Sequence, residues 1–460
     1  MQTQTFLRQP LAAVIVFAFS GATHATPVVR SATADNLNLA AAWVGDPPAL
    51  PTTANTATWN SSSTLANTLG ANLTWGALDT SAASGAVVIA GNNNLLLDHA
   101  TDASTVFATG ANNFTWGATP ATGGLFHIYG APGNASTAQG ATFSGSGTVT
   151  IGGTGIKNWS SFSSTNGVTH INFTGTLALR GAAIPGVGTL PGNWLALGGG
   201  GGDAANPGTT VQTGAFALDL GDESSCGAFI LTQGFNNQAL KLTSLGGTGS
   251  VRADWGIGAP VSNRTIELDQ AGDTTLSGSL LAHNGSGQRR NVTLVKKGAG
   301  SLTLAGALGT SGGTASLNFD LQAGKIQLGN GGGTPTFVGT LDAAASTFAV
   351  GAGTELVFDR SGAFNWPYRH SGSGTIRLKA EFGNIAFTGN SSSFAGSVIV
   401  EQGSLRMGPS LGAATLTVKS GALLFMATAA TGGTSQVGAL TLEDGSESDF
   451  RIGANRDQLV

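Results

Sequence analysis

The sequence is poor in cysteine and in charge. Cys226 is the only cysteine among 460 residues, which excludes an internal disulfide and a zinc site built on paired cysteines. Charged residues make up 10% of the chain, against a usual share of about 25%. The net charge is −4, whereas a nucleic-acid-binding surface calls for a basic excess. Stability must therefore come from packing, and nucleic acid is not an expected partner.

Helical patterning and long apolar runs are also missing. Apolar residues do not recur at helical spacing, and glycine or proline interrupts nearly every window. The first 25 residues combine Arg8, an apolar run at 11–19 that is too short to span a bilayer, and the small residue Ala25. This pattern predicts a secretory signal peptide over residues 1–25 and no transmembrane helix after it. We therefore expect a secreted protein, extracellular or on the cell surface.

Short alternating segments dominate what remains. In residues 372–408 and 297–329, apolar residues recur two positions apart. Successive side chains leave a strand on opposite faces, so each pair predicts a short strand with one buried face. Gly, Ser and Asn between the pairs turn the chain easily. The expected inward residues are Ile376, Leu378, Ile385, Phe387, Val398, Val400, Leu405 and Met407, and upstream Leu302, Leu304, Leu317, Phe319, Leu321, Ile326 and Leu328.

These two stretches align with each other: SLTLAG at 301–306 with NIAFTG at 384–389, and DLQAGKIQLG at 320–329 with IVEQGSLRMG at 399–408. They resemble the autotransporter-associated β-strand repeat of bacterial passenger domains. The resemblance implies a right-handed parallel β-helix carried to the cell surface, and it implies no catalytic residue. A membrane barrel or other anchor would then lie beyond residue 460, and we expect the chain to be truncated at its C-terminus.

The expected fold is all-β, a right-handed parallel β-helix (β-solenoid) of short strands with Gly, Asn and Ser turns. Its coils must stack, because one coil cannot bury enough apolar surface to fold alone. The expected organisation is a signal peptide at 1–25, an N-terminal cap at 26–56, an irregular β-solenoid with Trp-Gly repeats at 57–290, and regular strand repeats at 291–460.

A tryptophan-glycine pair recurs in the first half. NLTWGA at 72–77 returns as NFTWGA at 113–118, a spacing of 113 − 72 = 41 residues. Trp75 and Trp116 would form either a glycan-stacking platform or rung-to-rung stacks within or along the solenoid. The repeat spacing favours the second interpretation.

Two further groups are candidate sites. Trp366, Tyr368, Arg369 and His370 look like an insertion between rungs, which would either bind a sugar by ring stacking or plug a gap. A Gly-rich loop at 198–203 is a second candidate for binding.

Glu267, Asp269 and Asp273 form the sharpest acidic group. If Ile266 and Leu268 are buried, Glu267 and Asp269 project outward together, and carboxylates with carbonyls would supply the six to eight oxygens of a calcium site. A solvated strand face is the simpler interpretation. Further clusters are Asp219, Asp222 and Glu223; Glu443, Asp444, Glu447 and Asp449; and the basic Arg289, Arg290, Lys296 and Lys297, which loop solubility explains more simply than an anionic ligand.

The sequence thus favours a non-enzymatic surface protein with a structural or adhesive role, no cofactor, and surface glycans or other cell-surface molecules as partners. The first alternative is a carbohydrate-active β-helix enzyme, a polysaccharide lyase or hydrolase, using Glu267 and Asp269 with Arg252 or Arg264. The second is a repeat segment that promotes secretion of a linked domain.

Overall fold

The computed structural model describes residues 26–45, 47–91, 93–98, 105–117, 126–130, 141–152, 158–164, 168–180, 193–197, 209–222, 225–226, 228–231, 238–253, 261–285, 288–332, 335–408, 410–425, 434–449 and 458–459. The predicted signal peptide and the loop at 198–203 lie outside these residues. Among the described residues, no helix has the length and apolar character needed to cross a bilayer.

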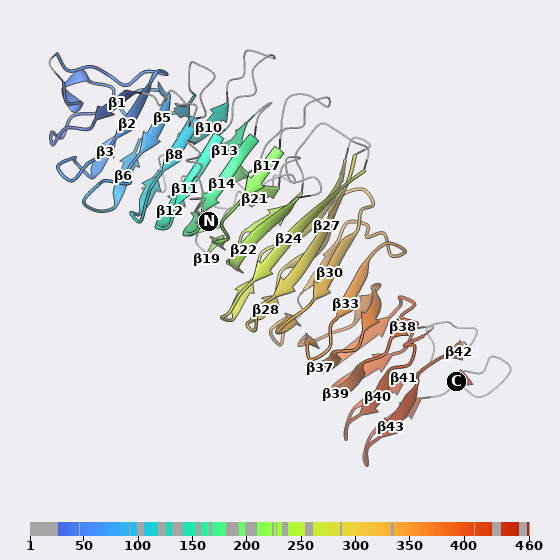
Figure 1. The fold of residues 1–460 in the computed structure, drawn as a ribbon. Helices are drawn as coiled ribbons and strands as arrows, with labels where there is room; N and C mark the ends of the chain where they lie inside the picture. The colour runs from blue at the N-terminus through green and yellow to red at the C-terminus, as the bar shows by residue number, and fades with distance from the viewer. Residues whose placement is uncertain are drawn as a thin grey trace, which may run out of the picture.

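The molecule is an elongated stack of parallel coils, and each coil contributes one short strand to each of three faces (Figure 1). One coil consists of β27 (Gln288–Lys297), β28 (Ser301–Leu304) and β29 (Ala307–Gly312). The next coil repeats this order, as β30, β31 and β32 pair in parallel with those three strands. This arrangement confirms the predicted all-β parallel solenoid.

The first face is a ladder that begins with β1 (Thr26–Val29), β2 (Asn55–Thr58), β5 (Ala77–Asp79), β8 (Thr105–Ala108), β11 (Ala141–Gly145), β14 (Val168–Phe173) and β17 (Thr209–Gln212). It resumes with β22 (Ala239–Gly246), β24 (Val261–Asp269), β27, β30 (Leu317–Leu321), β33 (Thr347–Val350), β36 (Arg369–Gly372) and β38 (Ser393–Phe394). The two parts meet where the Gln212 side chain bonds to the backbone of Lys241, accepting from its N–H at 2.8 Å and donating to its carbonyl at 2.7 Å.

The second face begins with β3 (Ala66–Thr68), β6 (Val87–Ala90), β9 (Phe114–Trp116), β12 (Thr148–Ile151), β15 (Thr176–Leu179) and β18 (Phe216–Asp219). The end of β22 pairs with β18, so that strand turns from the first face onto the second. The face continues through β25 (Thr274–Leu276), β28, β31 (Lys325–Leu328), β34 (Glu355–Phe358), β37 (Thr375–Phe387), β39 (Ser397–Arg406), β40 (Thr415–Val418) and β43 (Ala439–Leu442).

The third face begins with β4 (Leu73–Trp75), β7 (Leu95–Leu97), β10 (Phe126–Gly130), β13 (Asn158–Ser164), β16 (Asn193–Leu197), β21 (Ala228–Leu231), β23 (Ser250–Arg252), β26 (Leu280–Gly285), β29 and β32 (Thr336–Val338). After these come β35 (Phe364–Trp366), the second halves of β37 and β39, then β41 (Leu423–Phe425) and β44 (Glu447–Asp449). The remaining elements are a 3₁₀ turn at Ala40–Ala42, a hairpin of β19 (Gly221–Asp222) with β20 (Ser225–Cys226), and the pair β42 (Thr434–Ser435) and β45 (Gln458–Leu459).

A single apolar interior runs the length of the stack. All fifteen residues predicted to point inward in 297–329 and 372–408 are buried, and they belong to one continuous cluster. The alternation is visible along β30, where Leu317, Phe319 and Leu321 are buried while the residues between them are partly exposed. Strand periodicity therefore identified the core face correctly in both stretches.

Coil length varies more than the sequence indicated. The coil that runs from Thr169 to its partner Thr210 is long, whereas the coil from Val398 to its partner Leu416, near the other end of the stack, is short. The described strands of long and short coils nevertheless pair in parallel. The paired positions are farther apart in the sequence, and less evenly spaced, in the first half of the chain than in the second.

The interior interpretation of the two tryptophans is confirmed, but the predicted equivalence of their positions in the repeat was wrong. Trp75 lies on the third face in β4, whereas Trp116 lies on the second face in β9, so the spacing of 41 residues does not connect equivalent positions. Trp75 contacts Trp43 at 5.4 Å and Trp59 at 6.2 Å between ring centroids, whereas Trp116 stacks on Phe126. Trp75 and Trp116 are both buried, so neither offers a platform for a glycan.

The first coils are closed by residues of the predicted cap. Trp43 packs edge-on against Trp59 at 5.7 Å. The buried Arg30 side chain donates to the Asn67 Oδ1 atom at 2.8 Å and to the Ala42 carbonyl at 2.6 Å. These bonds hold the loop that contains the 3₁₀ turn against the neighbouring coil and satisfy a cation away from water.

Glycines mark corners where neighbouring coils come very close. At the corner between the second and third faces, a Cβ atom on Gly278 would lie 1.7 Å from the Gly249 carbonyl oxygen, and one on Gly306 would lie 1.8 Å from the Gly278 carbonyl oxygen. Only a residue without a side chain fits between backbones at this separation. By contrast, a Cβ on Gly272 would meet nothing within 4 Å.

We predict that Gly278→Ala lowers the free energy of unfolding by about 2–3 kcal/mol, because the added methyl group must push two coils apart. The matched variant Gly272→Ala should change it by less than about 0.5 kcal/mol. Denaturant titration followed by circular dichroism measures both. Equal effects of the two substitutions would contradict the close coil contact.

Candidate functional site

The four predicted binding residues do not form an exposed insertion. Trp366 ends β35, Arg369 and His370 begin β36, and the side chains alternate along the chain. Trp366, Tyr368 and His370 each have 0% exposure, whereas Arg369 is exposed. Stacking on a sugar requires a ring face open to solvent, which these three rings lack. Their placement matches the alternative interpretation, in which the aromatic group fills the interior.

The buried rings form one aromatic cluster. Trp366 stacks on Tyr368 at 4.4 Å and contacts Phe358 edge-on at 5.0 Å. Phe337 lies 5.6 Å from Trp366, and Phe348 lies 6.0 Å from it. Aromatic pairs at these separations add to the burial energy of the rings. The cluster stabilises the coils around β35 and offers no binding surface.

His370 is held as a neutral imidazole inside this cluster. The Trp366 indole N–H donates to the His370 Nε2 atom at 2.9 Å, so Nε2 must carry the lone pair. The His370 Nδ1 atom therefore carries the proton and donates to the Ser391 Oγ atom at 2.9 Å. Burial lowers the pKa of His370 from 6.5 to about 3, and it raises the pKa of Tyr368 well above its usual value.

We predict that acid destabilises the protein through His370. In the unfolded chain this imidazole takes up a proton below its ordinary pKa of 6.5, whereas the folded chain resists protonation down to about pH 3. Stability contributed by this group is thus complete above pH 6.5 and is lost as the pH falls toward 3, by on the order of 2 kcal/mol at pH 5.

Thermal unfolding between pH 7 and pH 4.5 checks this prediction. The His370→Gln variant has no titrating ring at this position, so its melting temperature should fall less steeply with acid than that of the wild type. Parallel pH profiles of the two proteins would show that His370 does not titrate as proposed.

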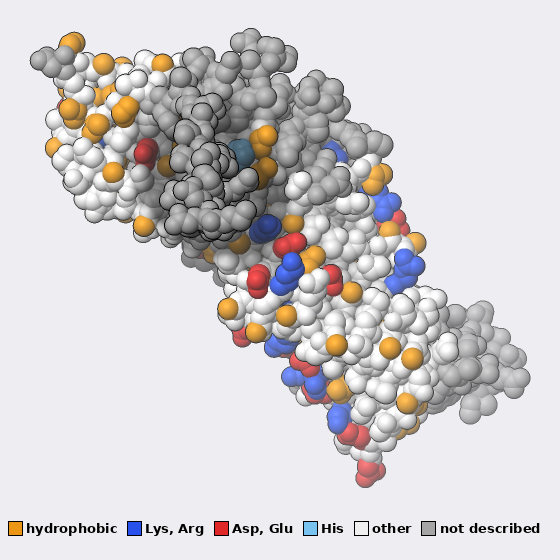
Figure 2. Space-filling view, viewed as in Figure 1, with side chains coloured by type: hydrophobic (Ala, Val, Ile, Leu, Met, Phe, Trp, Pro, Cys, Tyr) orange, Lys and Arg blue, Asp and Glu red, His pale blue; other side chains and the backbone are white. Residues whose placement is uncertain are grey.

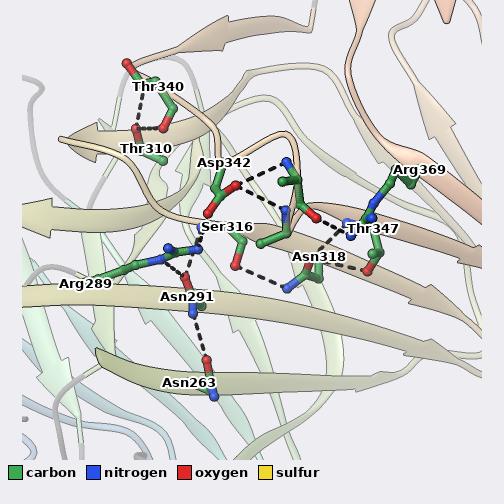
Figure 3. A network of polar contacts seen from close by, with 12 residues as sticks. Asn263, Arg289, Asn291, Thr310, Ser316, Asn318, Thr340, Asp342, Thr347 and Arg369 are labelled. Atoms are coloured by element: carbon green, nitrogen blue, oxygen red, sulfur yellow. Dashed lines mark hydrogen bonds and ion pairs between the residues drawn. The ribbon is translucent and has the colours of Figure 1, made fainter. Parts of the chain in front are cut away.

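Arg369 takes part in a polar network that crosses several coils (Figure 3). Its guanidinium donates to the Ala344 carbonyl in the turn after Asp342. From the other side, Arg289 forms an ion pair with Asp342 at 2.7 Å. The Asp342 Oδ1 atom accepts from the N–H groups of Ala344 and Ala345 at 3.1 and 3.2 Å. Arginines from two coils therefore hold one turn in place.

Asparagine side chains extend the same network between coils (Figure 3). The Asn291 amide donates to the Asn263 Oδ1 atom at 2.9 Å, and its own Oδ1 accepts from the Ser316 N–H at 3.0 Å. The Asn318 Oδ1 atom accepts from the Thr347 N–H at 3.0 Å. These bonds satisfy backbone donors where strands begin, which is a structural role.

We predict that Asp342→Ala lowers the free energy of unfolding by about 1–2 kcal/mol, because the turn loses two hydrogen-bond acceptors and an ion pair. Asp320→Ala is the control, since the Asp320 carboxylate, as far as the described residues go, accepts one side-chain hydrogen bond, from the Gln322 amide at the surface. That control should cost less than about 0.5 kcal/mol. Denaturant titration is the measurement, and a neutral Asp342→Ala would refute the clamping role.

A small polar hollow of about 330 Å³ lies beside Arg369 on the first face. The residues around it are Thr347, Arg369, His370, Ser371, Asn390, Ser392 and Ser393. The hollow carries hydroxyl and amide groups with one cation already bonded to the Ala344 carbonyl. Its chemistry is that of a weakly polar surface recess, without a nucleophile paired to a base.

The structure directs Glu267 and Asp269 outward, as predicted, because Ile266 and Leu268 are buried between them. However, Glu267 forms an ion pair with Lys297 at 3.1 Å, and the Asp273 carboxylate accepts from the Ser301 N–H at 2.7 Å. In the part of the chain that the structure describes, no three His, Cys, Asp or Glu side chains gather to hold a metal ion.

The neighbouring lysine further occupies this acidic region. Lys296 is buried, and its ammonium donates to the carbonyls of Lys297 and Gly298 at 2.6 and 2.8 Å. Burial lowers the pKa of Lys296, while the charges of Asp269 and Asp273 act in the opposite direction. Lys296 therefore adds a buried positive charge on the inward side of the strand that is next to Glu267 and Asp269.

The arginines suggested as lyase bases are not placed for that role. Arg264 lies on β24 with 0% exposure, and Arg252 lies on the third face, away from Glu267 on the first. The basic stretch of Arg289, Arg290, Lys296 and Lys297 belongs to strand β27 and not to a solvated loop. Arg290 is buried in this strand. Arg289 forms an ion pair with Asp342, and Lys297 forms one with Glu267.

In each of the other two acidic clusters, one carboxylate forms an ion pair. Asp219 pairs with Arg180 at 2.5 Å, and Glu443 pairs with Lys419 at 2.5 Å. Glu223 lies outside the described residues. Figure 2 shows acidic and basic side chains close to each other, most densely along the lower-left edge of the C-terminal half.

Sequence reasoning missed a groove in the C-terminal coils. A hollow of about 780 Å³ follows the corner between the second and third faces, where it crosses β37, β39, β41 and β44. Gly383, Gly403 and Gly421 line it and leave its floor without side chains. The sequence does contain a glycine at this corner in each successive coil. That pattern could have indicated the groove, but a glycine in an ordinary turn looks the same in the sequence.

Comparison with known proteins adds no assignment. No protein-family model, curated protein or solved structure matches this chain. The resemblance to the autotransporter-associated repeat therefore rests on the two aligned stretches.

Proposed function

We propose that this chain is a secreted or surface-displayed β-solenoid with a structural or adhesive role. The supporting observation is the continuous apolar interior, which joins successive coils from Leu37 to Val437 into one rod. Such a stack provides length and a large, regular outer surface, and solenoids use such surfaces for binding. The leader-like residues 1–25 and the aligned repeats support export to the bacterial surface.

The outer surface fits an extracellular spacer or adhesin. Its charged side chains are few and form ion pairs with each other, as Arg377 does with Glu355 at 2.6 Å and also with Glu401. The remaining outward positions are largely Thr, Ser, Asn and Gln, which hydrogen-bond to hydroxylated partners without a strong field. No observation favours the lyase alternative, since Glu267 and Asp273 are already bonded within the protein.

Surface labelling of intact cells tests the proposal. An epitope tag inserted after Gly331, an exposed turn position with open space around it, should be labelled by antibody without lysis and removed by added protease. Deletion of residues 1–25 is the control and should abolish labelling while leaving tagged protein inside the cell. Labelling of the full chain only after lysis would reject the proposal. If the chain at the surface is always found cleaved from a linked domain, the result would favour the alternative in which the repeats promote secretion of that domain.

A further inference from the structure

The groove at the C-terminal corner contains hydrogen-bonding groups that the protein leaves unused. The Asn384 Oδ1 atom is buried and accepts no hydrogen bond from any described residue. Gln402 lies in the next coil along the same groove, and Glu447 lies in the coil after β41. Among the described residues, Glu447 makes no ion pair. Gln402 and Glu447 therefore bring an amide and a carboxylate to the lining of the hollow, while the Asn384 Oδ1 atom is closed to solvent until its side chain turns.

An aromatic ring accompanies these oxygens. Phe425 and Leu423, both on β41, line the groove and are only partly buried. The guanidinium carbon of Arg406 lies 5.7 Å from the centre of the Phe425 ring, and the Arg406 Nε atom has no hydrogen-bond partner among the described residues. An apolar patch beside a few polar groups is the usual composition of a site that binds small molecules.

The charged side chains around the groove limit which class of ligand it can bind. Glu401 is neutralised by Arg377 and lies 3.9 Å from Lys379. Glu447 adds a negative charge to the groove and Arg406, beside Phe425, adds a positive one. Neither sign is in excess, so a polyanion such as a uronic-acid polymer gains no net attraction. Hydroxyl groups donate to carboxylate and amide oxygens, and the C–H face of a sugar ring can pack on Phe425 through its electron-rich face. A neutral carbohydrate meets all these requirements.

The groove is also elongated along the rod, because it crosses coils that follow one another at about 4.8 Å. We infer that the corner groove lined by Asn384, Gln402, Phe425 and Glu447 binds a neutral oligosaccharide chain laid parallel to the axis of the solenoid. This inference deepens the proposed function and rests on it in one respect: a secreted chain must reach a glycan-bearing surface.

Isothermal titration calorimetry of the purified full chain tests the inference. The probes are neutral hexasaccharides based on glucose, mannose, galactose or N-acetylglucosamine, with a uronic-acid hexasaccharide as the charged comparison. At least one neutral probe should bind more tightly than the uronide. For that probe, Phe425→Ala should weaken binding about tenfold, whereas Val338→Ala, on the third face in an earlier coil, should leave the affinity unchanged.

Gln402→Ala provides a second groove variant, with circular dichroism confirming that each variant is folded. It should also weaken binding, even if Phe425→Ala fails to fold. The inference is overturned if no neutral probe binds, if the uronide binds best, or if folded groove variants bind as the wild type does. These outcomes are separate from the labelling of intact cells: surface display without oligosaccharide binding rejects the groove alone, whereas failure of export rejects the proposed function.

Discussion

The close parallel stacking of coils governs this molecule. Most strands hydrogen-bond to the equivalent strand of a neighbouring coil, at a separation of about 4.8 Å. Inward side chains must therefore be apolar at every level, and backbones must nearly touch at the corners. The contact of Gly278 with the Gly249 carbonyl and of Gly306 with Gly278 is a direct consequence, because any Cβ atom would enter the neighbouring coil.

The same stacking determines how polar groups are used. A side chain that points outward has equivalent positions above and below it, so acids, bases and amides find partners in adjacent coils. Arg377 lies between Glu355 and Glu401, and Asn291 bridges to Asn263. This pairing explains why acidic groups that resemble a calcium site in the sequence are already satisfied in the fold. The unpaired groups of the C-terminal groove are an exception to this pairing between coils.

Polar and basic side chains are also buried in the core. His370 fits among aromatic rings because its two nitrogens meet Trp366 and Ser391, which satisfies both without a charge. Arg264 and Lys296 show that some inward positions on the first face accept long basic side chains. The first face is consequently less uniform than the alternating pattern of its strands indicates.

Local periodicity by itself indicated the short strands, their inward residues and a solenoid, since alternation depends only on neighbouring residues in one chain segment. That the strands run parallel was implied by the resemblance of the two repeat stretches to the autotransporter-associated repeat. Leu317, Phe319 and Leu321 could be assigned to the core for that reason. Which coil lies beside which was decided only by the tertiary structure, because loops between strands differ in length and the sequence does not mark where each coil closes. Trp75 and Trp116 therefore fell on different faces despite their matching hexapeptides, and Trp366 proved to be interior. The groove depends on the register of several coils at one corner, so its residues, from Asn384 to Glu447, came together only in the folded stack.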